Sequence, residues 1–75
     1  MSIYVEIGET IIYLRKQKGF TQEKLALEAE ISISYMRLIE RGAANPTIRE
    51  LQKIADVLEA ELRNPFAVPA AVGAL

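Results

Sequence analysis

Apolar residues recur at helical spacing early in the chain, at Ile7, Ile11 and Leu14. Spacings of three and four residues place side chains on one face of a helix. Gly19 suits the left-handed position that follows a helix. The pattern therefore predicts a helix over roughly residues 5–18, and residues 2–5 either extend it or form an arm ahead of it.

Two shorter helices are predicted next, with only two or three residues between them. The first, over about residues 22–29, begins after Thr21, a favourable N-cap residue. The second, over about residues 33–41, begins after Ser32 and ends before Gly42. The apolar residues expected to face inward from this pair are Leu25, Ala26, Ala29, Met36 and Ile39.

A fourth helix is predicted over about residues 48–58. Asn45-Pro46 is a turn signal, and Thr47 with Glu50 forms a capping box in which each side chain satisfies a free backbone N–H. The apolar stripe of this helix consists of Ile48, Leu51, Ile54, Ala55 and Leu58.

The last residues continue this pattern only briefly. Pro65 prevents a long continuation of the fourth helix, and a short fifth helix fits around residues 61–64. Residues 67–75 have no helical period and are expected to be a tail. The sequence thus predicts one all-α domain over residues 1–66, a compact bundle of four to five short helices.

Composition narrows the function classes. The chain has 75 residues, half of them apolar, and contains neither cysteine nor histidine. A disulfide framework, a zinc site and a histidine-based catalytic triad are therefore excluded. There is no run of 18 apolar residues and no signal-peptide pattern. We expect a cytoplasmic protein with no cofactor, no metal, no membrane partner and no small-molecule substrate, and no set of residues that would make it an enzyme.

Charge is distributed unevenly along the chain. The net charge is −1, but residues 15–53 hold eight of the nine basic residues and five of the ten acidic ones, which gives this segment +3 and the remainder −4. A basic middle with acidic ends suits a body that presents one face to an anion. The alternative is an ordinary solvated mixture of charges.

The two short helices are a candidate helix-turn-helix. Ala26 is small where the helices should approach most closely, near Met36, and a bulky residue there should cost ~1–3 kcal/mol. Residues 7–58 contain an ordered set of short motifs: Leu14-Arg15, Lys18-Gly19, Thr21-Gln22, Leu25-Ala26, Ser32, Ile39-Glu40-Arg41-Gly42, Pro46 and Ile54-Ala55. In these motifs and their spacing the chain resembles the Cro/phage-repressor (XRE-type) helix-turn-helix family.

The resemblance implies a lambda repressor-like DNA-binding domain for double-stranded DNA. The helix over residues 33–41 would enter the major groove, and the helix over residues 22–29 would cross the backbone. The implied base or groove contacts are Ser32, Ile33, Ser34, Tyr35, Arg37 and Leu38, and the implied phosphate contacts are Thr21, Gln22, Arg41 and Asn45.

Several of these residues have a second interpretation. Ile33 and Leu38 cannot hydrogen-bond, so they would touch thymine methyl groups or form a surface for protein. Tyr35 would offer its ring to a thymine and its hydroxyl to a phosphate, or pack on a neighbouring helix. Gln22 would otherwise be an exposed residue at a helix start.

Two further features follow from the resemblance. Arg15 and Glu40 should form a structural ion pair, and removing one partner of such a buried pair costs ~3–5 kcal/mol. Glu30 stands where the family usually has glycine, so a retained left-handed turn would cost roughly 1–2 kcal/mol.

The expected partner besides DNA is a second copy of the chain, because dimers place two such helices about one DNA turn apart. We predict the dimer interface at Val57, Leu58, Leu62 and Phe66. Small size, and the stretch from Ser32 to Ile48, resemble restriction–modification controller proteins, which regulate their own promoters. The alternatives are an antitoxin or a protein–protein adaptor built on the same fold.

Overall fold

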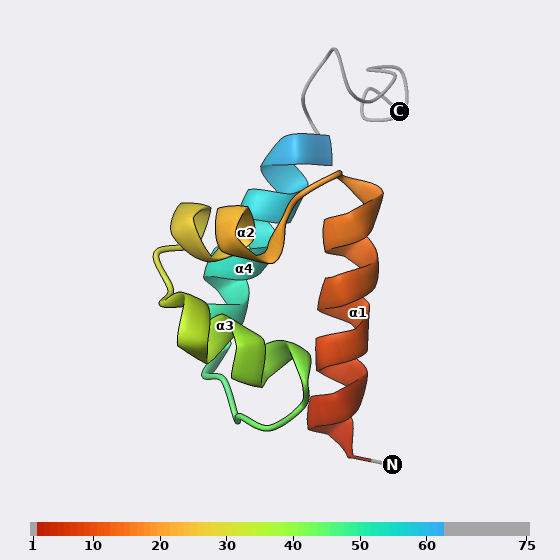
Figure 1. Cartoon of the computed structure of the whole chain (residues 1–75), viewed down its shortest axis with the longest axis vertical. Coiled ribbons are helices and arrows are strands. Elements are labelled where there is room, and N and C mark those ends of the chain that lie inside the picture. Colours follow the sequence, from red (N-terminus) through yellow and green to blue (C-terminus); the bar gives the residue numbers. More distant parts are fainter. Residues whose placement is uncertain (1, 63–75) are drawn as a thin grey trace.

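The computed structural model describes residues 2–62, with side chains to residue 59. Within this range the chain forms four helices: α1 (Ile3–Gln17), α2 (Gln22–Glu28), α3 (Ile33–Glu40) and α4 (Ile48–Leu62). Figure 1 shows α2 and α3 as a short angled pair, with α1 along one side and α4 behind them. The predicted all-α class is confirmed.

The first helix starts earlier than its apolar pattern indicates. Ser2 is its N-cap, and the Ser2 hydroxyl accepts a hydrogen bond from the Tyr4 backbone N–H at 3.1 Å. Residues 3–5 therefore extend the helix rather than forming an arm. At the other end Gly19 has φ +74°, the left-handed conformation that the sequence predicts after this helix.

Both helices of the central pair begin at the predicted caps. The Thr21 hydroxyl accepts from the Lys24 N–H at 3.0 Å, and the Ser32 hydroxyl accepts from the Tyr35 N–H at 3.1 Å. The turn between them passes through Glu30 at φ 59°. The left-handed turn is thus kept without glycine, and the Ile31 N–H closes it by donating to the Ala26 carbonyl at 2.9 Å.

The capping box of α4 is also present. The Glu50 N–H donates to the Thr47 hydroxyl at 3.1 Å, and the Thr47 N–H donates to the Glu50 carboxylate at 2.8 Å. The helix then continues to Leu62, four residues past its predicted end. Of the predicted fifth helix, residues 61 and 62 belong to α4, and residues 63 and 64 lie outside the described range, as does the proposed tail.

The predicted apolar stripe of α4 is wrong at two positions. Ile48 is 84% exposed and Ala55 is also exposed, whereas Ile54 and Leu58 are buried. At ~100° per residue, Leu58 lies about 40° from Ile54 around the helix, and Ile48 and Ala55 lie about 120° and 100° away. Those two residues are therefore at the edge of the stripe, beyond the reach of the core.

The core lies where all four helices meet. Its fully buried large side chains are Leu25 of α2, Met36 and Ile39 of α3, and Ile54 of α4. Ala26 is 3% exposed, in agreement with the close helix approach predicted there. Leu58 is 4% exposed and belongs to this core, so its side chain has little surface to give to the predicted dimer interface. The side chains of Leu62 and Phe66 lie outside the described residues.

Candidate nucleic-acid interface

The third helix has one buried face and one exposed face. Met36, Ile39 and Glu40 are buried, and the exposed residues are Ser34, Arg37, Leu38 and Arg41, the last at the C-cap. Pairs four residues apart share a helix face, which groups Ser34 with Leu38 and Arg37 with Arg41. These four residues, called the α3 outer face below, combine a hydroxyl, an apolar group that is 36% exposed and two cations.

Two of the predicted groove residues are held partly inside the molecule. Ile33 and Tyr35 are half-buried and pack against the core. The Tyr35 hydroxyl donates to the Glu50 carboxylate at 2.7 Å. The interaction of Tyr35 with a neighbouring helix, which the sequence left as its second interpretation, is the one observed. A phosphate contact by this hydroxyl would require it to leave Glu50.

The Tyr35–Glu50 pair changes the acidity of both groups. The hydrogen bond to Glu50, together with burial and the nearby negative charge, raises the pKa of Tyr35. The Thr47 backbone N–H and then the Tyr35 hydroxyl lower the pKa of Glu50. At neutral pH the pair is therefore a phenol donating to a carboxylate, and it links α3 to the start of α4.

The predicted ion pair between Arg15 and Glu40 is present and nearly dry. Arg15 Nε lies 2.8 Å from Glu40 Oε2 and Nη2 lies 3.0 Å from Oε1, with side-chain exposures of 12% and 3%. Arg15 Nη1 also donates to the Phe20 carbonyl at 3.0 Å. Such a two-pronged geometry fixes orientation as well as distance, so it holds the end of α3 against α1.

Gln22 joins this ion pair, a role that the sequence did not indicate. Its Nε2 donates to Glu40 Oε1 at 2.9 Å, and the residue is half-buried. A primary amide has a second N–H and a carbonyl oxygen, so a phosphate contact remains compatible with this bond. Gln22 is thus positioned by the same carboxylate that positions α3.

Two glycines let α1 approach the end of α3. A Cβ on Gly8 would lie 2.5 Å from the Glu40 carbonyl oxygen, and a Cβ on Gly42 would lie 2.7 Å from Val5 Cα. Gly42 also has φ +75°. The pattern of apolar residues does not indicate this role of Gly8. A glycine inside an otherwise helical pattern was the available signal for a close backbone approach.

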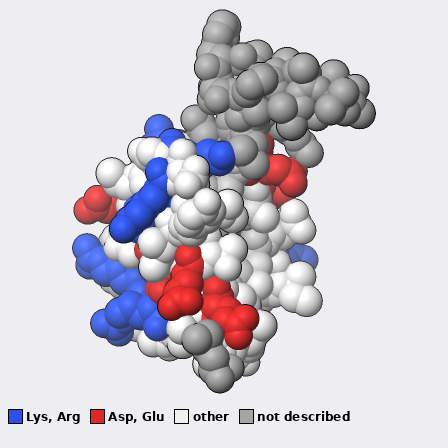
Figure 2. Space-filling view, turned by 90° about the vertical axis from the view of Figure 1, so that its right-hand side faces the viewer, with Lys and Arg blue, Asp and Glu red and all other residues white. Residues whose placement is uncertain are grey.

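Of the four predicted phosphate-contacting residues, Arg41 belongs to the α3 outer face and Gln22 is half-buried. Thr21, Arg41 and Asn45 are exposed. The Thr21 and Ser32 hydroxyls accept cap hydrogen bonds, and each keeps its own hydrogen free to donate. In Figure 2, which shows the α1 side, Lys and Arg gather along the left of the view and the largest acidic area lies in the lower middle. The exposed acids of α1 include Glu6 and Glu9.

Other kinds of site find little support in residues 2–62. This range holds no group of three or more acidic side chains placed to bind a metal ion. None of its helices combines the length and the apolar character that crossing a membrane requires.

The chain is similar in sequence to known helix-turn-helix proteins. A family model described as helix-turn-helix matches residues 11–63. The HTH-type transcriptional regulator SlrR of Bacillus subtilis is 43% identical over 61 residues, covering 80% of this chain and 40% of SlrR. The immunity repressor of Bacillus phage phi105 is 38% identical over 52 residues, covering 69% of this chain and 36% of the repressor.

A shorter relative matches over most of its own length. The uncharacterized HTH-type transcriptional regulator YazB of Bacillus subtilis is 45% identical over 51 residues, which covers 68% of this chain and 74% of YazB. The chain spans less than half the length of SlrR and of the phage repressor. The similarity therefore covers only part of those longer proteins, and the family model covers α2, α3, α4 and the C-terminal half of α1.

Proposed function

Because this chain belongs to the Cro/phage-repressor (XRE-type) helix-turn-helix family, we propose that it binds double-stranded DNA in a sequence-specific way and regulates transcription. The binding unit is a homodimer on an operator. In each copy α3 enters the major groove and α2 crosses the DNA backbone.

The observation that carries this proposal is the α3 outer face on an immobilised helix. Ser34 can donate to or accept from a base edge, and Leu38 can contact a thymine methyl group. Arg37 can reach a base edge or the DNA backbone, and Arg41 can neutralise a phosphate. The helix that presents them is fixed by a cap at Ser32 and by the core contacts of its other face.

Specificity in this protein depends less on hydrogen bonds than in many DNA readers. No Asn or Gln lies on α3, so Arg37 and Arg41 are its only side chains capable of a two-pronged contact with a base. Thymine methyl contacts, DNA shape and the spacing of the two half-sites would supply the rest.

Phosphate contacts are assigned to Thr21, Gln22, Arg41 and Asn45. The structure supports Gln22 in particular, because its bond to Glu40 fixes the amide at the start of α2 while one N–H stays available. Arg15 binds the same carboxylate. Glu40 therefore positions both the proposed phosphate contact of Gln22 and the end of α3.

The homodimer is placed in the last third of the chain. Of the four predicted interface residues, Val57 is the one whose described side chain is half-buried and offers surface to a partner. An autoregulatory role of the controller type is the finer form of this proposal, and it rests on the resemblance of residues 32–48 to those regulators.

A second candidate function is a protein–protein adaptor or an antitoxin. Leu27 is 76% exposed and Ile48 is 84% exposed, and exposed apolar side chains are common in surfaces that bind protein. Such a protein would keep the fold and lose the salt-dependent affinity for DNA.

The test is titration of the protein onto the DNA upstream of its own gene at two salt concentrations. We expect affinity to fall steeply with salt, in proportion to the phosphates neutralised. Gln22→Ala should weaken binding to all sequences alike, and Ser34→Ala should change the order of preference among sequences.

Exposed Gln17, on the C-terminal turn of α1, gives the matched control. Gln17→Ala should leave both affinity and preference unchanged. Affinity that is indifferent to salt would contradict the proposal and favour the adaptor. Unchanged binding in both Gln22→Ala and Ser34→Ala would refute the assignment of these site residues.

A further inference from the structure

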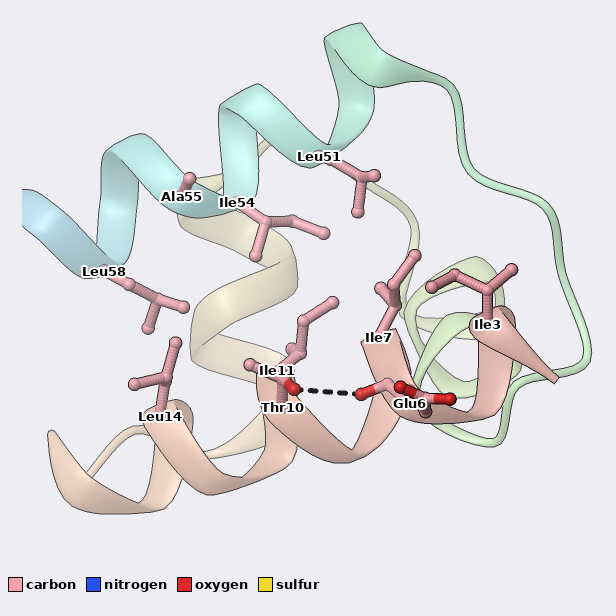
Figure 3. A pocket seen from close by; sticks show the side chains of 10 residues that line it. All are labelled: Ile3, Glu6, Ile7, Thr10, Ile11, Leu14, Leu51, Ile54, Ala55 and Leu58. Atoms are coloured by element: carbon pink, nitrogen blue, oxygen red, sulfur yellow. Dashed lines mark hydrogen bonds between the residues drawn. The ribbon is translucent and has the colours of Figure 1, made fainter. Parts of the chain in front are cut away.

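The first turn of α4 has little apolar packing to hold it in place. Ile48 and Arg49 are exposed, and Leu51 is only half-buried. An apolar groove of about 380 Å³ lies between α1 and α4. Figure 3 shows Leu51 facing Ile3 and Ile7 across the end of this groove where both helices begin. The position of this turn therefore depends on contacts other than those with α1.

A short hydrogen-bonded network supplies such a contact. The Tyr35 hydroxyl, in the first turn of α3, donates to Glu50 Oε1 at 2.7 Å. The same oxygen accepts from the Thr47 backbone N–H at 2.8 Å, and the Thr47 hydroxyl accepts from the Glu50 N–H at 3.1 Å. Hydrogen bonds to a carboxylate are stronger than those between neutral groups. One carboxylate oxygen therefore joins the start of α3 to the capping residue of α4.

The loop that leads into this network carries Asn45. At the end of α3 the Ala43 N–H donates to the Leu38 carbonyl at 2.9 Å. Farther along, Asn45 is exposed and Pro46 is buried. Pro46 has a fixed φ and is the one residue between Asn45 and Thr47, so a displacement of Thr47 is transmitted to Asn45.

We propose that Tyr35 is a positioning residue for the phosphate contact of Asn45. Its hydroxyl, acting through Glu50 and Thr47, fixes the loop relative to α3. A loop that is ordered before DNA arrives loses less conformational entropy on binding, and the affinity is correspondingly higher. The inference rests on the proposed function, and it gives Tyr35 a role different from the groove contact that the family resemblance implies.

The surroundings of the hydroxyl favour this role over a direct contact with DNA. A phenol has one hydrogen to donate, and in Tyr35 that hydrogen goes to Glu50. A phosphate oxygen only accepts, so it could bind the hydroxyl only after this bond had been broken. The Glu50 carboxylate would also repel a phosphate brought to the same place.

A double-mutant cycle on DNA affinity tests the proposal. Tyr35→Phe keeps the ring and removes the hydroxyl. It should weaken binding to the DNA upstream of the gene about three- to tenfold, as for the loss of one hydrogen bond. In an Asn45→Ala chain the same substitution should have no further effect, because the contact that the hydroxyl positions is already absent.

Tyr13→Phe is the matched control. It removes a hydroxyl from a tyrosine of α1 that is 63% exposed. This variant should bind the same DNA with the affinity of the unaltered chain.

A second measurement needs no DNA. Backbone amide relaxation measured by NMR reports how well ordered a loop is on the fast timescale. In Tyr35→Phe the order parameters of the amides of residues 43–47 should fall, while those of α1 stay as they are in the unaltered chain. Tyr13→Phe should change neither set.

Three outcomes would overturn the inference. Unchanged affinity in Tyr35→Phe would mean that the hydroxyl plays no part in binding. An equal loss in the unaltered and the Asn45→Ala chains would mean that it contacts DNA directly. Unchanged order parameters in residues 43–47 would show that it does not fix the loop. The absence of salt-dependent binding by the unaltered chain is a different result, since it would refute the proposed function and the inference with it.

Discussion

Glu30 occupies a backbone conformation that ordinary residues avoid, with φ 59° in the turn between α2 and α3. The left-handed region costs a non-glycine residue roughly 1–2 kcal/mol, because Cβ approaches the following carbonyl oxygen. The turn keeps this conformation because it sets the angle between the two short helices, and the core beneath it contains Leu25 and Met36.

Glu30→Gly should therefore stabilise the protein. Relief of the strain is offset by the larger entropy that glycine loses on folding, about 0.5–1 kcal/mol, so the expected net gain is about 0.5–1 kcal/mol. For a domain of this size that corresponds to a Tm increase of about 2–8 °C. Urea unfolding gives the free energy directly.

Glu28→Gly is the matched control, since it makes the same change at the last residue of α2. Glycine within a helix lowers the free energy of unfolding by about 0.5–1 kcal/mol relative to alanine. Equal destabilisation by both variants would show that the turn at Glu30 stores no strain.

At the scale of single residues, the sequence is a poor guide to hydrogen bonds and ion pairs between side chains that lie far apart along the chain. Gln22 and Glu40 are separated by 18 residues, and no local pattern connects them. The ion pair between Arg15 and Glu40 was predicted through the family resemblance, not through spacing. Gly8 was overlooked because the pattern of a helix shows which face is apolar, not how closely another backbone approaches.

Among the elements, the link between α3 and α4 depends on the protonation of Glu50. Its pKa is lowered by the Thr47 N–H and the Tyr35 hydroxyl. A carboxyl whose pKa is lowered in the folded state stabilises the protein at pH values above its ordinary pKa of 4.5. This stabilisation is lost as the pH falls through the folded-state pKa. Tyr35 behaves oppositely. Because its pKa is raised in the folded state, it stabilises the protein at pH values below its ordinary pKa of 10.0. This stabilisation is lost as the pH rises through the folded-state pKa.

We therefore expect the free energy of unfolding to decrease as the pH falls below about 4.5, with a smaller decrease in Glu50→Gln. Urea unfolding over a series of pH values measures this. Tyr35→Phe should reduce the decrease on the alkaline side while retaining the capping box. Identical acid profiles for the unaltered chain and Glu50→Gln would contradict the role of this carboxylate.

Helix starts were the most predictable feature of the elements. Thr21, Ser32 and Thr47 all act as the sequence indicates, because a cap is a local interaction over two or three residues. The end of α4 and the exposure of Ile48 were not predicted, because both depend on how far the neighbouring helices extend.

At the scale of the whole molecule, two copies must cooperate if the proposed operator binding is correct. We expect sedimentation to give twice the mass of one chain at about tens of micromolar, the range in which weak homodimers form. Val57→Glu should shift the mass toward one chain and reduce DNA affinity, because one recognition helix contacts only a few base pairs.

The matched control is Gln52→Glu, which adds the same charge on α4 at an exposed position. It should remain dimeric. A monomeric unaltered chain would remove the dimer from the proposal.

The separation of buried and exposed side chains on α3 bears on how such proteins diversify. The side chains that anchor the helix, Met36, Ile39 and Glu40, are distinct from the outward set of Ser34, Arg37, Leu38 and Arg41. Substitution of the outward residues alone leaves the buried contacts of the helix unchanged. Under the proposed DNA contacts, a few substitutions among the outward residues would therefore change the DNA sequence that is bound without changing the residues that fold the helix.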